Sequence, residues 1–271
     1  MKVISKSIII LIFLIGILLS YLSTFGIETN RFNNQISNKI QQIDEKLEIE
    51  LKKIKLVIDP FSLKINIKTI GPKLKKQNKT IEIENVITQI SLKSLISNEF
   101  SIENLEISTK PLEIKNLISF LRSFQNSPEL FILEKAIDKG YFIADIKIEF
   151  NSKGKIKDNF EIDGLIKDAK LSFFNEYNIQ NLDLIFDYKK NFLSIKDITL
   201  SFNNLNLLSE KVLIKTINDQ FSITGNINHK NLDIDEKNLD LLIKPFLPKI
   251  DLKKLRFNSN NNFSFKINKK F

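Results

Sequence analysis

The 271-residue sequence has no cysteine and no tryptophan, and its one histidine is His229. Without cysteine, disulfides, zinc–thiolate sites and cysteine nucleophiles are excluded. A lone histidine between Asn228 and Lys230 is expected to be a plain surface residue. Phosphate-binding glycine loops, the HExxH zinc motif and the nucleophile elbow are also missing. We therefore expect a protein that is not an enzyme, with no catalytic residues, no cofactor and no metal.

Glycine and proline are scarce, with seven and six residues, which argues against low-complexity linkers. Lysine and arginine outnumber aspartate and glutamate by 41 to 32, giving a net charge of +9. A basic excess attracts anionic lipid headgroups or nucleic acid. Here the lysines are spread along the whole chain, and Ile, Lys, Asn and Phe share AT-rich codons, so genome bias is the simpler explanation. We expect no nucleic-acid partner.

Acidic residues mostly alternate with apolar ones, which is typical of the solvated face of a sheet. The alternative is that two of these carboxylates, Asp233 and Asp235, form a functional site. Their place in the alternating pattern argues against this interpretation.

Residues Ile8 to Ile27 form a run of twenty residues without a charge. At a rise of ~1.5 Å per residue, a helix of this length crosses the roughly 30 Å hydrocarbon core of a bilayer. The alternative is a cleaved signal peptide, but its apolar region is usually about 7–15 residues long. The nearest cleavage-like triplet, Thr24 to Gly26, is weak. We predict that residues 1–28 are a cytoplasmic head and a transmembrane anchor, because a short head favours this orientation.

Residues 29–110 are predicted to form a helix followed by a first β unit. The helix runs from Asn30 to about Lys46, with one apolar stripe at Phe32, Ile36, Ile40, Ile43 and Leu47. We expect this stripe to pack on the sheet that follows. The period of the apolar residues then changes to two, which predicts strands over 54–58 and 61–67. A turn at Asp59-Pro60 separates the two strands, and a second turn at Gly71-Pro72 follows them.

Residues 111–140 interrupt the alternation with one or two helices, and Gly140 is the expected helix end. Residues 141–271 resume it, in strands around 142–150, 160–162, 171–173 and 221–227. The alternation is still running near Ile267, which favours either a truncated chain or an open sheet edge that needs a cover.

Four short segments switch the parity of the apolar positions: 83–86, 102–105, 179–182 and 195–198. With a strict period of two, the later apolar residues would turn to the wrong face. A β-bulge at Asn104, Asn181 or Asp197 restores them to one face and bends the strand. The alternative is a two-residue hairpin, but these segments lack the glycine that such turns favour. We predict bulges, and therefore a sheet that curls.

The order of these features resembles the N-terminal region of the AsmA-like family, the relatives of TamB and YhdP. The matching residues are the amphipathic helix ending in KLEIEL, then Ile83 to Val86, Ser94-Leu95-Ile96, Ile102 to Ile107 and Pro111. The resemblance covers most of the chain, through degenerate apolar patterns and no catalytic fingerprint. It implies a mainly β fold: a transmembrane and an amphipathic helix, then a long, curled, groove-like antiparallel sheet with a helical insertion.

The resemblance also implies a location and a function. The protein would be a single-pass inner-membrane protein with most of its chain in the periplasm, and its apolar groove would carry phospholipid or assist outer-membrane biogenesis. The chain is shorter than the relatives that bridge the two membranes. The resemblance therefore implies either that the chain works with partner proteins or that it is part of a longer protein. The alternative is an anchored envelope scaffold that recruits biogenesis proteins through an exposed sheet edge. The expected groove residues are Leu63, Ile65, Ile67, Ile146, Ile148, Phe150, Phe173, Leu182, Leu184, Phe186, Leu200, Phe202, Phe221 and Ile223.

Overall fold

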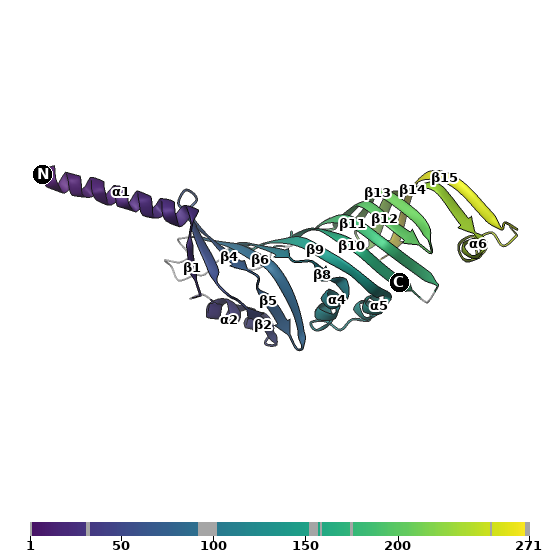
Figure 1. Cartoon of the computed structure of the whole chain (residues 1–271), viewed down its shortest axis with the longest axis horizontal. Helices are drawn as coiled ribbons and strands as arrows, with labels where there is room; N and C mark the ends of the chain where they lie inside the picture. Colours follow the sequence, from purple (N-terminus) through teal and green to yellow (C-terminus); the bar gives the residue numbers. More distant parts are fainter. Residues whose placement is uncertain are drawn as a thin grey trace. The chain divides into compact units, whose positions relative to one another are not determined.

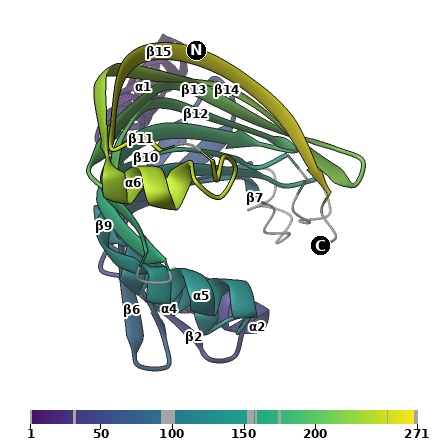
Figure 2. The ribbon, with the colours of Figure 1, turned by 90° about the vertical axis from the view of Figure 1, so that its right-hand side faces the viewer.

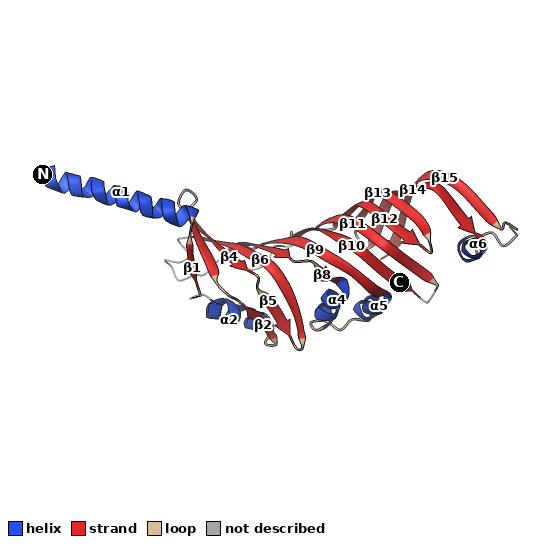
Figure 3. Cartoon of the chain, in the orientation of Figure 1, coloured by secondary structure: helices blue, strands red, loops and turns tan. Residues whose placement is uncertain are grey.

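The computed structural model describes residues 2–30, 33–91, 102–151, 157, 159–173, 176–249 and 251–268. The chain is mainly β, and its strands pair antiparallel in a sheet that does not close (Figures 1 and 3). It divides into two compact units, Met1–Lys110 with Asp145–Phe160, and Pro111–Ala144 with Glu161–Phe271. Strand β9 (Ile137–Glu149) contributes residues to both units. The predicted fold class is confirmed.

Helix α1 (Lys2–Thr24) contains the apolar run. Its segment Lys6–Thr24 has a mean hydropathy of 2.4 and no buried residue, so by length and composition it is able to span a membrane, as a signal sequence also is. The predicted span to Ile27 is too long by three residues. Gly26 has a φ of 68° and ends the helical path, and Ile27–Thr29 forms β1.

The first unit is a sheet with one helix on it. Helix α2 (Asn33–Ile43) is shorter than the predicted helix, and Phe32 lies outside the described residues. Ile36 of α2 packs on the buried cluster of Ile54, Ile65, Ile67 and Ile90, as expected. The strands follow the order β1 (Ile27–Thr29), β3 (Ile54–Asp59), β4 (Lys64–Ile70), β6 (Lys79–Ser91), β7 (Ile102–Thr109) and β9, while β5 (Lys73–Lys76) joins β6 to β2 (Leu47–Glu50).

The second unit carries the helical insertion, which is two helices, α4 (Ile114–Arg122) and α5 (Pro128–Ala136). Its sheet runs through β8 (Leu112–Glu113), β9, β10 (Glu161–Phe173), β11 (Tyr177–Lys189), β12 (Phe192–Phe202), β13 (Leu205–Ile217), β14 (Gln220–Asp235) and β15 (Lys254–Asn268). A short helix, α6 (Glu236–Leu242), lies between β14 and β15. Helix α6 was not predicted from the sequence.

Gly140 is not a helix end. Helix α5 stops at Ala136, and Gly140 lies inside β9 with a φ of 137°. A Cβ on Gly140 would lie 2.8 Å from the Ala169 side chain, so the strand needs glycine for this close approach.

The predicted bulges are confirmed. Asn181 and Asp197 have φ angles of 52° and 51°, and the β11–β12 register shifts between Gln180 and Asp183 and between Asp183 and Ile185. The β6–β7 register shifts beside Asn104 and again after Ile83. Cross-strand partners point to the same face of a sheet. The pairings therefore place Leu193, Ile195, Ile198 and Leu200 on one face.

Side chains of the neighbouring strand satisfy backbone groups that bulges free. The Asp168 N–H donates to Asp183 Oδ1 at 2.7 Å beside the bulge in β10. The N–H groups of Glu210 and Lys211 both donate to Asn226 Oδ1 at 3.1 Å, where β13 shifts against β14. These contacts compensate for missing ladder hydrogen bonds.

The predicted strand over 61–67 begins later, at Lys64. Asp59 forms a local turn, because its Oδ1 accepts hydrogen bonds from the N–H groups of Phe61 (3.0 Å) and Ser62 (3.2 Å). Leu63 has a φ of 53°, and Phe61 is 98% exposed. Because apolar residues also alternate through this turn, the sequence predicted a strand that starts three residues too early.

Candidate functional site

The sheet of the second unit has one apolar and one polar face. Phe186 lies opposite Gly164 and Ile195, Ile195 lies opposite Val212, and Val212 lies opposite Gly225. Because opposite residues share a face, the register carries one apolar row across β10 to β14. Residues on the other face include Asp183, Asp187, Lys196 and Thr199. Leu182, Leu184 and Phe186 therefore lie on one face, and Asp183 and Asp187 on the other, as predicted.

Helices cover two parts of the apolar face. Ile114 and Ile118 of α4 are buried against Ala169 and neighbouring residues of β9 to β11. Leu239 of α6, 2% exposed, is buried against Leu205, Leu232 and Ile234 of β13 and β14. Figure 2 shows the strands of this unit bending over α6. The helices thus lie on the same face and leave part of it uncovered.

We call the uncovered part the open apolar face. Its members lie on β11 to β15 and belong to neither buried cluster of the described chain. Phe221 and Phe265 are 36% and 46% exposed, and the others are half-buried. The members are Leu184, Phe186, Tyr188, Leu193, Ile195, Val212, Ile214, Phe221, Ile223, Phe263, Phe265 and Ile267, joined across the bulges by Tyr177, Ile179, Ile198, Leu200 and Phe202.

Two glycines shape the open apolar face. A Cβ on Gly164 would lie 2.7 Å from the Phe186 ring, and a Cβ on Gly225 would lie 2.7 Å from the Phe263 ring. Each phenylalanine therefore lies over a glycine of the next strand, which keeps the ring close to the sheet. Phe186 also stacks on Phe142, with ring centroids 5.7 Å apart.

The opposite face carries ion pairs. Lys196 pairs with Asp187 at 2.9 Å, and Lys189 pairs with Glu161 at 3.0 Å. Burial raises the pKa of Asp183, but the hydrogen bonds from Lys167 and from the Asp168 N–H outweigh it, so the pKa is lowered. The Lys189 pKa is raised by its hydrogen bond to Glu161. This face is built to meet water, in contrast to the open apolar face.

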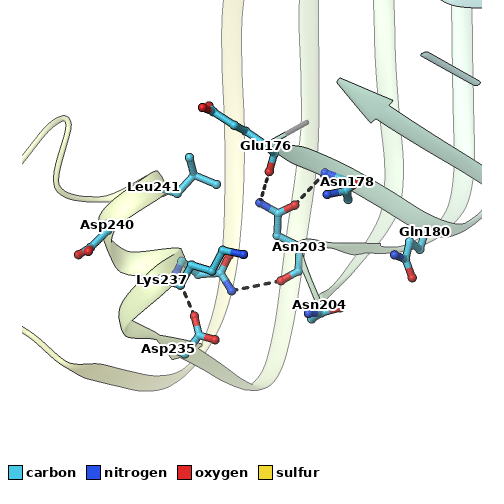
Figure 4. Close-up of a pocket in the computed structure, with 10 residues that line it drawn as sticks. Glu176, Asn178, Gln180, Asn203, Asn204, Asp235, Lys237, Asp240 and Leu241 are labelled. Atoms are coloured by element: carbon cyan, nitrogen blue, oxygen red, sulfur yellow. Dashed lines mark hydrogen bonds between the residues drawn. The ribbon is translucent and has the colours of Figure 1, made fainter. Parts of the chain in front are cut away.

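A polar pocket of 540 Å³ lies where the start of β11, the β12–β13 turn and α6 approach one another (Figure 4). Asn203 Oδ1 accepts the Asn178 N–H at 2.7 Å, and Asn203 Nδ2 donates to the Glu176 carbonyl oxygen at 3.1 Å. Asn238 Nδ2 donates to the Asn203 carbonyl oxygen at 3.1 Å. These hydrogen bonds join the ends of two hairpins to α6, so the pocket residues hold α6 against the sheet.

The expected groove residues fall into several environments. Ile65 and Ile67 are buried in the core of the first unit, and Leu63 lies in a turn, so the structure does not bring these three to the open apolar face. Ile146 and Ile148 face Ile107 and Leu105 of β7, and Phe150 follows β9. Leu182 packs at the cluster under α4. Phe173 lies opposite Tyr177, while Leu184, Phe186, Leu200, Phe202, Phe221 and Ile223 belong to the open apolar face.

His229 and the acidic pair have structural roles. His229 lies on the apolar side of β14, half-buried, with its ring edge-on to Phe257 at 6.1 Å, and so is not a plain surface residue. Asp233 pairs with Lys254 and Arg256 at 3.0 and 2.7 Å. Asp235 caps α6 by accepting the Asn238 N–H at 2.9 Å.

None of the groove residues predicted from the sequence lies on β13 or β15. Phe263, Phe265 and Ile267 of β15 alternate with polar residues as clearly as the residues that were predicted, whereas Val212 and Ile214 of β13 are separated by the apolar Leu213. That alternation was an available signal. The comparisons add nothing to this geometry, since no protein-family model, curated protein or solved structure matches the chain.

Proposed function

We propose that the chain is a membrane-anchored AsmA-like protein whose open apolar face holds the acyl chains of phospholipids. One observation carries the proposal: an apolar surface that continues over β11 to β15 and is left uncovered by the helices on the same face. Soluble proteins rarely expose contiguous apolar patches larger than a few hundred Å² unless they bind something. The bend of the strands suits a long, flexible apolar ligand.

The proposed mechanism is passive and needs no catalytic group. Each acyl CH₂ that leaves water for the apolar face contributes about 0.8 kcal/mol. The phenylalanine rings that lie over Gly164 and Gly225 offer apolar contact area without directional bonds. Directional hydrogen bonds would favour one lipid position, whereas a row of hydrocarbon side chains allows a chain to slide. The charged headgroup stays in water.

We place α1 in the inner membrane and the two units in the periplasm. The apolar segment Lys6–Thr24 and the short head before it support this placement. Under this proposal the protein takes part in phospholipid transport or in outer-membrane biogenesis, together with envelope partners.

A pair of adjacent substitutions on β13 tests the proposal. Ile214 lies on the open apolar face and Leu213 lies on the opposite face. Ile214→Asp should lower the lipid that co-purifies with the full chain, or that native mass spectrometry detects on it, at least about tenfold, because a carboxylate cannot be desolvated by an acyl chain. Leu213→Asp is the matched control and should retain lipid. Equal lipid on both variants, with both folded, would remove the proposal.

A second function is favoured by β15. This strand has 15 residues and ends the strand order of the described chain, so its outer edge offers unpaired backbone groups. An envelope protein could add a strand there. A photo-crosslinking residue at Asn260, which is exposed, would then yield one defined protein adduct in cells, while Ile214→Asp would leave the function unchanged.

A further inference from the structure

The turn between β3 and β4 lies beside the end of α1. Ile27 of β1 is opposite Leu56 of β3, and Thr29 is opposite Ile54. Because the two strands are antiparallel, β3 continues past Leu56 toward the point where α1 ends. A Cβ on Gly26 would lie 2.3 Å from the Leu56 carbonyl oxygen and 2.9 Å from a Val57 methyl, so the backbone directly after α1 lies against β3. Figure 1 shows α1 ending where these first strands begin.

This turn presents apolar side chains on a fixed backbone. Phe61 is 98% exposed and Leu63 is 63% exposed. The Asp59 carboxylate holds the turn, through the N–H groups of Phe61 and Ser62 and through the Ser62 hydroxyl at 2.6 Å. Leu63 adopts a φ of 53°, a conformation that is unfavourable for leucine. The chain thus bears a strained, ordered loop that presents two exposed apolar side chains.

Two exposed aromatic residues lie at the end of α1, one in its last turn and one directly after it. Tyr21 and Phe25 are 54% and 63% exposed, and their rings stack with centroids 5.3 Å apart. Aromatic side chains at the end of a spanning helix favour the region between headgroups and hydrocarbon. The register above places the Phe61 turn next to that same end of α1.

We propose that the turn over 60–63 inserts Phe61 and Leu63 into the interface of the bilayer that α1 spans. The inference rests on the proposed anchoring by α1 and adds a second contact to it. One helix leaves a body free to rotate about the helix axis, whereas a second contact fixes which side of the first unit's sheet meets the membrane. It also accounts for the exposure of Phe61, which the sheet does not need.

The absence of cysteine makes the test direct. Single variants Phe61→Cys, Phe25→Cys and Asn78→Cys of the full chain would carry a fluorophore and be reconstituted in phosphatidylcholine vesicles. Asn78 is the matched control, since it is an exposed residue in the β5–β6 turn of the same unit. Quenching by lipids with a nitroxide just below the headgroup reports contact with the interface. Phe61 and Asn78 are exposed, so the label should not disturb folding at either position.

We expect quenching at position 61 to be comparable to that at position 25, and at least about fivefold stronger than at position 78, because only an inserted side chain meets the lipid-borne quencher. Quenching at 25 with none at 61 would overturn the second contact and leave the anchor intact. An absence of quenching at 25 would instead overturn the anchor itself, and the second contact with it.

Discussion

Asn181 and Asp197 hold left-handed backbone conformations at the points where β11 and β12 shift register. Asparagine and aspartate tolerate this conformation better than other residues with a side chain, because their short polar groups bond locally. Their presence is what allows the parity switch, and so keeps the apolar residues on both sides of each bulge on one face.

Substitution of Asn181 tests this role. Valine should lower the free energy of unfolding by about 1–2 kcal/mol, because its branched Cβ meets the carbonyl oxygen in a left-handed conformation. Glycine has no such penalty and should leave stability nearly unchanged. Urea unfolding of the two variants would measure the difference. An equally stable Asn181→Val would contradict the bulge assignment.

Glu82 in the first unit makes a prediction about pH. The hydrogen bonds from Lys73 at 2.8 Å and Lys110 at 3.0 Å lower its pKa from 4.5 to about 2. A depressed pKa means that the group stabilises the fold above pH 4.5 and loses that contribution as the pH falls toward 2. Carboxyl chemical shifts across this range would report the titration. Glu82→Gln should remove this part of the acid sensitivity, whereas a midpoint near 4.5 in the native chain would show that the two lysines do not hold the carboxylate.

At the scale of the elements, the strands and bulges could be predicted because apolar alternation and its parity switches are local in sequence. The Phe61 turn could not, since Phe61 and Leu63 continue the alternation and only the Asp59 side chain ends it. Helix α6 has seven residues, too few for a helical period to stand out, although Asp235 is a suitable cap. In the sequence, Gly140 follows a helical pattern and so predicts a helix end. Its real role depends on the close approach of Ala169, which is distant in sequence.

The uncovered part of the site could not be predicted from alternation. Ile65 and Ile223 both alternate with polar residues, yet Ile65 lies in a buried cluster on which α2 packs, and Ile223 belongs to no buried cluster of the described residues. Which strands a helix covers depends on contacts between residues far apart in the sequence. The sequence predicts the apolar face, and the folded chain decides which part of it is open.

The bulge in β13 makes a prediction at this scale. Asn226 Oδ1 accepts hydrogen bonds from the N–H groups of Glu210 and Lys211. Asn226→Ala should lower the free energy of unfolding by about 1–3 kcal/mol, because two backbone donors lose their acceptor. Asn226→Asp keeps an acceptor oxygen and should retain most of the stability. Hydrogen exchange at Glu210 and Lys211 should rise only in the alanine variant, and equal protection in both would show that water replaces the side chain freely.

At the scale of the whole molecule, each unit pairs a sheet with helices, but to different effect. In the first unit the helix α2 packs on a buried cluster of isoleucines. In the second, α4, α5 and α6 bury two separate clusters and leave the open apolar face. The proposed function depends on the second unit, and the proposed membrane contacts depend on the first. The two proposals can therefore fail separately.

Photo-crosslinking at two adjacent positions of β11 tests the central claim most directly. Phe186 lies on the open apolar face, and Ile185, which is 46% exposed, lies on the opposite face. Both residues are apolar, so a difference in lipid capture between the two positions reflects the face of the sheet and not the residue type. We predict phospholipid adducts from a crosslinking residue at position 186 and few from position 185. Equal lipid capture at both positions, or capture at neither in a folded chain, would contradict the account.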